Sequence, residues 1–310
     1  QDGTEGLGET CATAYLIRWL DELIRLEENS LYGDIMERSI YNGLFAAQSP
    51  DGRRLRYYVP FEGPRVYFDG DTYCCPCNYR RIVAELPGMV YYRIKNGVAV
   101  NLYTPSKADF QFTDDLAVQI EQETDYPNSG EVSVRVRPSK TVSFPLFLRI
   151  PRWCERARIE VNGTAIEMTC PGGSFYSIER EWNKDDQIQL SMSMPWRFVW
   201  GRQAQAGRIA VMRGPQLFCL NLEKNPGAHG IDLRQVYIDP ETIEGPFPDD
   251  TVRPGGMACR IKGLKSLGFS TGGNHDLTLT LTEFPDPGGV FTYFRVRKMQ
   301  ETGMEDELMQ

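Results

Sequence analysis

The hydrophobic pattern of the sequence changes its period at Asn96-Gly97, and this change constrains the fold more than any other feature. Before it, apolar residues recur at helical spacing in three stretches, at residues 11–28, 31–44 and 78–86. After it, apolar and polar residues alternate in short runs separated by Gly, Pro, Asn and Asp. A period of 3.6 belongs to helices and a period of 2 to strands. Residues 1–95 are therefore predicted to be mainly helical and the remainder mainly β.

The alternating runs predict one or two antiparallel β-sandwiches, since many short strands at this density are typical of that architecture. We expect residues 96–200 to form one β-sandwich and residues 201–310 to form a second one or an extension of the sheet. The Pro-, Gly- and Asp-rich stretch 239–256 is expected to be a long loop or a weakly ordered insertion. The strongest runs are Val98–Leu102, Leu116–Ile120, Val132–Val136, Phe144–Ile150, Ile188–Met192, Ile209–Met212 and Leu277–Leu281.

The three predicted helices each carry an apolar stripe that needs a partner, and three helices are too few to bury all of these stripes among themselves. They are expected to be the last part of a larger helical domain. The chain starts at Gln1 and shows no basic-then-apolar signal pattern before Glu9. We therefore expect a cut within a longer protein, with an N-terminal helical segment missing.

Composition excludes several classes of function. The net charge is -8, from 34 Lys+Arg against 42 Asp+Glu, so no cationic face for nucleic acid is expected. No apolar run approaches the roughly 18 residues of a membrane-spanning helix, so no membrane partner is expected either. With only two histidines, His229 and His275, acid-base chemistry is expected to come from other side chains.

The placement of the eight cysteines is more informative than their number. Cys74, Cys75 and Cys77 fall within one tetrapeptide, and neighbours this close rarely form disulfides without strain. Metal binding or reactive thiols are therefore the leading interpretations. Four further cysteines are interpreted as small buried hydrophobic residues: Cys154, Cys170, Cys219 and Cys259.

Two segments that precede predicted helices contain the candidate chemistry. One holds Glu9 and Cys11, and the other holds Cys74 and Cys75. Helix N-termini favour thiolates, and zinc takes four N, S or O ligands, so these four residues are a candidate zinc site. The alternative stays open that Glu9 is a first-turn acid that stabilises its helix, that Cys11 is simply buried, and that the thiols around Cys74 have no common role.

These two segments resemble glycoside hydrolase family 127, the β-L-arabinofuranosidases. The family signature matches Glu9-Thr10-Cys11-Ala12 and, about sixty residues later, Cys74-Cys75-Pro76 followed by Asn78. The β region resembles the same family in Leu148-Arg149-Ile150-Pro151 with Trp153, in Val161-Asn162-Gly163, in the stretch 182–195, and in the stretch from Gly207 to Gly214-Pro215. The resemblance runs from about residue 8 to about residue 221.

The resemblance implies an α + β multidomain chain, in which the last helices of an (α/α)6 barrel, residues 1–95, are followed by antiparallel β-sandwich domains. It also implies that Zn2+ is held by Glu9, Cys11, Cys74 and Cys75, and that Cys74 is the nucleophile. Attack by a thiolate would give a thioglycosyl intermediate, which water would release with net retention. The partner would be an oligosaccharide or glycan substrate.

Two departures from the family matter. The family's acid/base glutamate lies upstream of the Glu-Thr-Cys segment, so it is not in this chain, and Glu5 does not occupy its position. The sugar-binding histidines of the early barrel are absent as well. At Cys77 the family usually has a small residue or proline; this thiol is a spectator, an alternative ligand, or a partner for a disulfide with Cys74.

Three functions stay open. The first is a retaining hydrolase of β-L-arabinofuranosyl linkages in plant glycans, and the second is a related enzyme for another pectic sugar. The third is a non-catalytic zinc-stabilised scaffold or carbohydrate-binding fragment. A second copy of the chain, in a homodimer, is one of the partners considered. Tyr58 and Tyr67 lie in a loop with Tyr57 and Arg65 that either lines a sugar pocket or packs internally.

The compartment is inferred from the cysteines. Five lie outside the proposed ligand set (8 minus Cys11, Cys74 and Cys75), and an odd number fits reduced thiols in the cytoplasm. A signal peptide on a missing segment would make the protein periplasmic or secreted instead.

Overall fold

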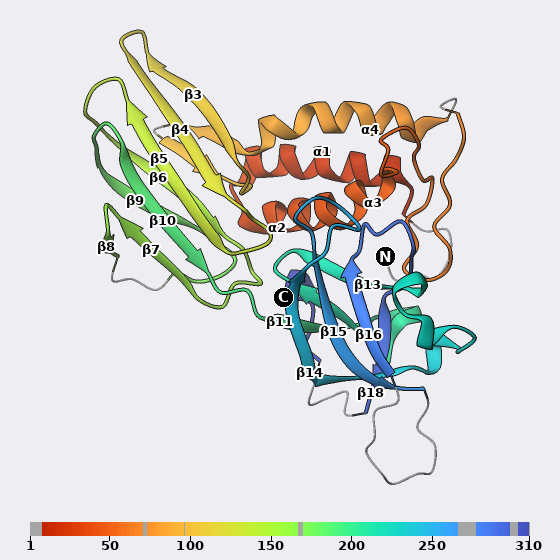
Figure 1. Ribbon diagram of the computed structural model, residues 1–310. Helices are drawn as coiled ribbons and strands as arrows, with labels where there is room; N and C mark the ends of the chain where they lie inside the picture. The colour runs from red at the N-terminus through yellow and green to blue at the C-terminus, as the bar shows by residue number, and fades with distance from the viewer. Residues whose placement is uncertain are drawn as a thin grey trace. The chain divides into compact units, whose positions relative to one another are not determined.

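The structure, a computed structural model, describes residues 8–70, 73–95, 97–166, 170–265, 277–297 and 303–309 (Figure 1). The chain divides into two compact units by its contacts. The first combines Gln1–Leu16, Arg38–Arg80 and Trp196–Gln310, and the second combines Ile17–Glu37 and Arg81–Pro195. The domain boundaries predicted at residues 95 and 200 stay predictions. Both compact units combine helical and strand segments that are distant in sequence. Helices followed by β-sheets, the coarse prediction, are confirmed.

The helices lie where the helical period predicted them. They are α1 (Thr10–Glu27), α2 (Ser30–Arg38), which continues through the π-helical turn Ser39–Leu44 into α3 (Phe45–Ala47), and α4 (Cys74–Glu85). Helix α4 begins four residues before the predicted start at Asn78. Pro76 permits this, since the first turn of a helix needs no N–H from that position. Within the described part of the chain, no helix is both long and apolar enough to span a membrane.

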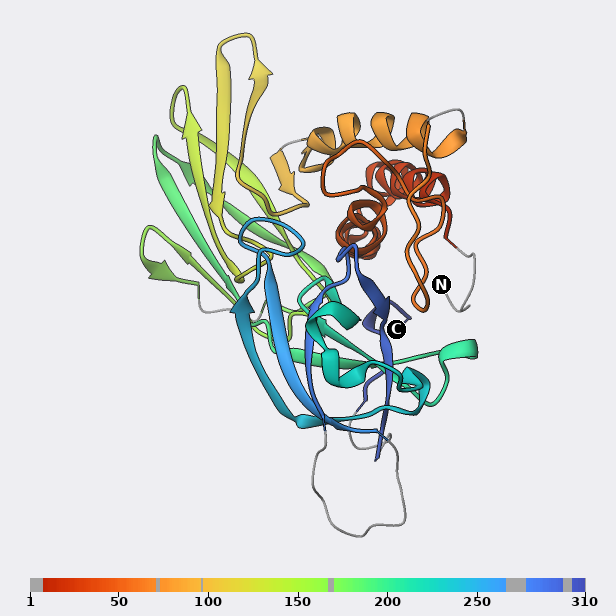
Figure 2. The same cartoon turned by 45° about the vertical axis from the view of Figure 1, so that its right-hand side comes forward.

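Two sheets make up the β part of the second unit and pack face to face in Figures 1 and 2. Buried and less buried residues alternate along the strands, as in β4 and β5, so one face of each strand supplies the core. Two pairings differ from the antiparallel expectation: β2 (Gly97–Val100) runs parallel to β6 (Val142–Ile150) in this unit, and β14 (Tyr237–Pro248) runs parallel to β18 (Tyr293–Val296) in the first unit. In sheet order the strands are β1 (Tyr91–Ile94), β2 (Gly97–Val100), β6 (Val142–Ile150) and β9 (Ser174–Trp182), and β3 (Ser106–Thr113), β4 (Leu116–Thr124), β5 (Glu131–Pro138), β10 (Asp186–Met192), β7 (Ala157–Val161) and β8 (Thr164–Ala165).

A buried ionic group joins α2 to β6 in the second unit. The guanidinium of Arg149, which is fully buried, bonds the carboxylates of Asp34 and Glu37, and its contact with Glu37 is 2.8 Å long. At Gly33 a Cβ would meet Asn101 Oδ1 at 2.3 Å and Arg149 Cδ at 2.6 Å, so only glycine allows this close approach.

The first unit contains one eight-stranded sheet that returns on itself, because β12 (Ile209–Arg213) also pairs with β13 (Gln216–Asn221). Its strands curve around a core that includes the fully buried Phe218 and Phe294 (Figure 2). In sheet order they are β11 (Trp196–Trp200), β12 (Ile209–Arg213), β18 (Tyr293–Val296), β14 (Tyr237–Pro248), β15 (Met257–Leu264), β16 (Leu277–Glu283), β13 (Gln216–Asn221) and β17 (Gly289–Phe291).

The prediction of a loop at residues 239–256 is wrong for its first half, since β14 runs from Tyr237 to Pro248. The register between β14 and β15 shifts between Asp239 and Glu244 and again between Glu244 and Phe247. Prolines are tolerated in strands at such irregularities, where no ladder hydrogen bond is required. The Pro and Gly content therefore marks an irregular strand rather than a loop.

Candidate active site

Three cysteine sulfurs from two helix N-termini come together in the first unit. Cys11 lies in the first turn of α1, and Cys74 and Cys75 open α4. The Sγ of Cys74 lies 3.4 Å from that of Cys11 and 4.0 Å from that of Cys75. All three sulfurs lie within 4.8 Å of one another, which is the spacing that a single metal ion requires of its ligands.

Glu9 lies beside this group without belonging to it in the present geometry. Its Oε2 accepts a hydrogen bond from Cys11 Sγ at 3.2 Å, and its Oε1 accepts one from the Tyr57 hydroxyl at 3.2 Å. Among the described residues, the set whose ligand atoms all lie within 4.8 Å of one another contains the three cysteines only. The carboxylate is therefore adjacent to Cys11, held between a thiol and a phenol.

Backbone pairing positions Glu9 and the start of α1. Glu9 forms an antiparallel bridge with Tyr58. The Thr10 N–H donates to the Tyr57 carbonyl at 3.0 Å, and its hydroxyl donates to the Arg56 carbonyl at 2.7 Å. The loop around residue 57 thus places the Tyr57 ring against Glu9.

The first turn of α4 separates its cysteines by exposure. Cys75 is fully buried, whereas Cys74 and Cys77 are exposed. The side-chain amide of Asn78 donates to the Cys74 carbonyl at 3.1 Å, and the Tyr79 hydroxyl donates to Gln48 Oε1 at 3.2 Å. These two bonds fix the start of the helix, so that Cys75 points inward while Cys74 stays accessible.

Burial and neighbouring groups disfavour the thiolate forms of Cys11 and Cys75. Burial raises the pKa of Cys11, and its hydrogen bonds with Cys74 and Glu9 raise it further. Burial also raises the pKa of Cys75, although the nearby backbone N–H of Cys11 opposes this. The hydrogen bond to Glu9 raises the pKa of Tyr57. Three thiols with a neighbouring carboxylate fit zinc, whose positive charge would lower the pKa values of these thiols.

Several aromatic residues surround Tyr57, which contacts Glu9. The Tyr57 ring contacts Tyr58 at 4.6 Å between centroids, and Phe68 and Tyr73 at 5.9 Å each. Tyr58 is 38% exposed and adjoins Glu9 through the backbone bridge. Tyr67 is engaged elsewhere: its hydroxyl accepts a hydrogen bond from Arg56 at 2.6 Å, and the guanidinium lies 4.4 Å from the ring centroid.

Tyr57 was not singled out by sequence reasoning as the residue that contacts Glu9. The two residues are 48 positions apart, and no local pattern joins them. Arg65, from the same loop, is buried and donates to the backbone carbonyls of Phe284 and Asp286, which is a structural role.

Among the residues that the structure describes, the remaining titratable candidates lie outside the three-sulfur group. The prediction that four cysteines are buried is confirmed, and burial raises the pKa of Cys154 to about 11 and that of Cys259 to about 12. His229 is exposed. Glu5 and His275 lie outside the described residues.

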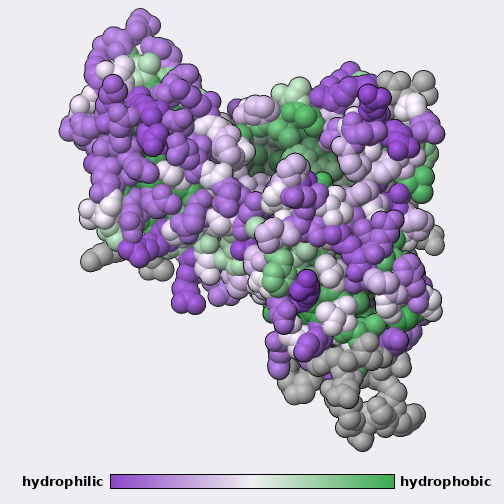
Figure 3. Space-filling view, in the orientation of Figure 1, coloured by the Kyte–Doolittle hydropathy of each residue, from purple (hydrophilic) through white to green (hydrophobic). Residues whose placement is uncertain are grey.

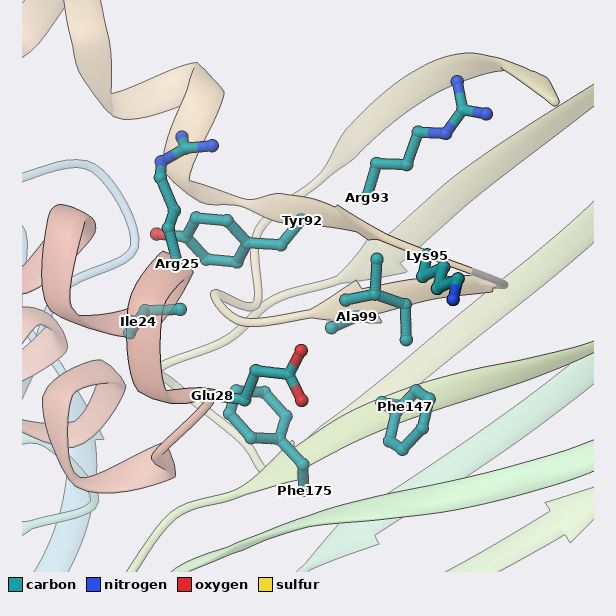
Figure 4. A pocket seen from close by; sticks show the side chains of 10 residues that line it. Ile24, Arg25, Glu28, Tyr92, Arg93, Lys95, Ala99, Phe147 and Phe175 are labelled. Atoms are coloured by element: carbon teal, nitrogen blue, oxygen red, sulfur yellow. The ribbon is translucent and has the colours of Figure 1, made fainter.

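A cavity of about 450 Å³ lies within the second unit, where α1 ends near the sheet of β1, β2, β6 and β9 (Figure 4). In the strand register, Ala99 pairs with Tyr92 on one side and with Phe147 on the other. The small side chain of Ala99 leaves space between these two larger residues. Figure 4 shows the Glu28 carboxylate near Phe175 and Ala99. The lining combines three aromatic residues with four charged ones and holds no cysteine.

Two family models match the chain. One, described as the catalytic domain of the GH127 beta-L-arabinofuranosidases, matches residues 1–88, and the other, the GH127 middle domain, matches residues 97–194. A curated relative, the non-reducing end beta-L-arabinofuranosidase of Bifidobacterium longum subsp. longum, is 30% identical over 244 residues, which are 71% of this chain and 36% of the relative.

Solved structures share the fold. A GH127 beta-L-arabinofuranosidase from Geobacillus stearothermophilus T6 superposes with a TM-score of 0.80 at 24% identity, over 93% of this chain and 50% of its own. A GH127 beta-arabinofuranosidase superposes with a TM-score of 0.79 at 26% identity, over 96% of this chain and 50% of its own. The chain thus spans about a third of the length of the curated relative and half of each of these two structures.

Proposed function

Since the chain belongs to glycoside hydrolase family 127, we propose that it carries the nucleophile and the metal ligands of a β-L-arabinofuranosidase. The observation that supports this most directly is the convergence of Cys11, Cys74 and Cys75 within 4.8 Å, next to Glu9. Two segments that are 63 residues apart in sequence supply these side chains. A thiolate group of this kind suits metal binding and nucleophilic attack together.

Zn2+ is the proposed metal, with Cys11, Cys74, Cys75 and Glu9 as its four ligands. Zinc accepts thiolates and a carboxylate in one tetrahedral set. When bound, it would supply the positive charge that keeps these thiols deprotonated and makes Cys74 a competent leaving group. Tyr57 would orient Glu9 as an outer partner, because its hydroxyl already donates to that carboxylate.

The Cys74 sulfur would attack the anomeric carbon of the sugar and form a thioglycosyl intermediate. Of the three clustered thiols, it is the exposed one, so a substrate can reach it. Water would then displace Cys74 with a second inversion at the same carbon, which gives net retention. The proton for the leaving group requires an acid, which we propose is a glutamate upstream of Glu9 in the whole protein.

The sugar would lie against the aromatic residues beside Glu9. Tyr58 keeps its proposed role, and Phe68, which is 44% exposed, joins it. Tyr67 would stabilise this loop, because its hydroxyl accepts a hydrogen bond from Arg56, and it would not bind the sugar directly. The substrate class that follows is a glycan with terminal β-L-arabinofuranosyl residues.

The helices would belong to an (α/α)6 barrel whose other helices cover α1. Tyr15, Trp19 and Leu26 are 55%, 65% and 77% exposed, although the helix is amphipathic. Figure 3 shows hydrophobic surface on the helical part of the molecule. An apolar stripe left open in this way supports packing against further helices of the same domain.

The test combines metal analysis, labelling and activity on the full expressed polypeptide. The expected result is one zinc per chain, hydrolysis of an aryl β-L-arabinofuranoside with retention, and covalent labelling of Cys74 by an arabinofuranose-configured electrophile. Cys74→Ser should lower kcat by at least about 10³-fold, since the nucleophile is lost. Cys77→Ser, an exposed thiol in the same turn, is the matched control. A label on any other residue, or near-normal activity in Cys74→Ser, contradicts the proposal.

A further inference from the structure

Cys74 and Cys77 are two exposed thiols in one turn of helix α4. Residues i and i+3 of a helix have Cα atoms about 5 Å apart, which follows from 3.6 residues per turn and a rise of 1.5 Å per residue. Disulfides need Cα atoms about 4.4–6.8 Å apart. The backbone of α4 therefore already holds these two residues at a disulfide distance, so the strain expected within this tetrapeptide applies to the adjacent pair Cys74 and Cys75 and not to Cys74 and Cys77.

The thiol between them is excluded from this pair by its position. Cys75 is fully buried and faces Cys11. A disulfide between the adjacent residues Cys74 and Cys75 would strain the backbone. Cys77 is not part of the three-sulfur group. A reaction at its thiol therefore does not by itself remove a proposed metal ligand.

The sequence of this turn matches a known redox arrangement. Two cysteines separated by two residues, the second of which is Pro76, open the helix. Cys-x-x-Cys at a helix N-terminus is the arrangement of dithiol–disulfide redox sites, because one short turn presents both sulfurs to solvent. Proline at this point restricts the backbone and keeps the turn in shape.

We propose that Cys74 and Cys77 form a reversible disulfide that withdraws Cys74 from the active site. The consequence for activity rests on the proposed function, whereas the disulfide itself does not. Rotation about the Cα–Cβ bond of Cys74 turns its sulfur from Cys11 toward Cys77. The oxidised protein would then lack both the nucleophile and one of the three clustered sulfurs.

The oxidant is a small-molecule disulfide of the glutathione class. The Cys74 thiolate attacks one of its sulfurs, forming a mixed disulfide and releasing the first small thiol. The Cys77 thiolate then attacks the Cys74 sulfur, forms the internal disulfide and releases the second small thiol. Two electrons pass from the protein to the oxidant, and the two protein protons leave with the two released thiols. A dithiol such as dithiothreitol reverses both steps.

The experiment treats the full expressed protein with oxidised glutathione and maps its disulfides by mass spectrometry of peptides. The expected result is a Cys74–Cys77 bond, loss of zinc, and an activity loss of more than about tenfold that dithiothreitol restores. Cys77→Ser keeps the first step but lacks the thiol that resolves it, so under the same treatment its Cys74 should carry glutathione and form no internal disulfide. It changes an exposed side chain by one atom, so folding should not be affected.

A second variant separates this bond from the competing one. Cys11→Ser removes the thiol that lies 3.4 Å from Cys74 and leaves Cys77 in place. It should still form the Cys74–Cys77 disulfide. A Cys11–Cys74 bond in the wild type, no internal disulfide at all, or a Cys74–glutathione mixed disulfide that persists equally in the wild type and in Cys77→Ser would overturn the proposal. If the reduced protein has no glycosidase activity, the proposed function fails, while the peptide map still decides whether this redox pair exists.

Discussion

The sulfur of Cys74 lies 3.4 Å from that of Cys11, although 63 residues separate them in the sequence. Each sulfur lies in the first turn of its own helix, α4 or α1. The contact therefore depends on two helix N-termini meeting, rather than on any local motif. The predictions below test what this meeting and the surrounding packing contribute.

Cys11→Ser should lower zinc content and thermal stability together. A ligand that binds only the folded protein stabilises it, so loss of zinc lowers the Tm. A chelator should lower the Tm of the wild type and leave that of Cys11→Ser almost unchanged. Metal analysis and thermal unfolding with and without chelator check this. Equal chelator sensitivity of both proteins would show that the metal is bound elsewhere.

Tyr57→Phe should weaken metal binding by about 10- to 100-fold, the usual effect of removing an outer partner of a ligand. The change deletes the hydroxyl that donates to Glu9 Oε1 at 3.2 Å and leaves the ring in place. Tyr58→Phe is the matched control, since the adjacent ring loses a hydroxyl that has no contact with Glu9 among those described. Competition with a zinc indicator measures both affinities, and equal loss in the two variants would argue against an orienting role for Tyr57.

Arg149→Ala should lower the free energy of unfolding by about 3–5 kcal/mol, because removing one partner leaves buried charge without compensation. Asp34 and Glu37 would both lose their cation. Lys140→Ala is the surface control: its ion pair with Asp115 has side chains 54% and 74% exposed, and such pairs contribute about 0–1 kcal/mol. Urea unfolding of both variants makes the comparison. A similar loss of unfolding free energy in both variants would mean that the buried ion pairs of Arg149 stabilise the protein no more than a surface pair does.

The stability of the protein should fall as the pH rises from about 4 to about 6 through the contribution of Asp34. Burial raises the pKa of Asp34 to about 6 from its ordinary 3.8, and Glu37 adds to the effect while Arg149 opposes it. Between these values the folded protein binds more protons than the unfolded one, so acidification favours the folded state in this window.

Asp34→Asn removes this titration and keeps the Arg149–Glu37 pair. The variant should lack the part of the pH dependence that Asp34 contributes. Urea midpoints measured across the window, for wild type and variant side by side, provide the test. Parallel curves for the two proteins would rule out Asp34 as the group responsible.

Local pattern was sufficient for much of this fold. The helical period of residues 11–28 predicted α1, because an apolar stripe at that spacing can be buried only as a helix. The alternation in residues such as Val132, Val134 and Val136 predicted strands, and these side chains are fully buried. Glu9, Cys11, Cys74 and Cys75 were identified from residue type, position at helix starts and family resemblance.

Long-range pairing was decided by the tertiary structure. The parallel alignment of β2 with β6, the closure through β12 and β13, and the irregular course of β14 involve partners that no local period specifies. The same holds for Tyr57, whose place beside Glu9 results from the backbone bonds of Thr10 to residues 56 and 57. The sequence by itself determines which side chains are apolar enough to be buried and where helix N-termini that favour anions occur, since both properties depend on residues close together in the chain. Which of them meet depends on packing over the whole chain, and that packing brings Cys11 to Cys74 and leaves Cys77 exposed beside them.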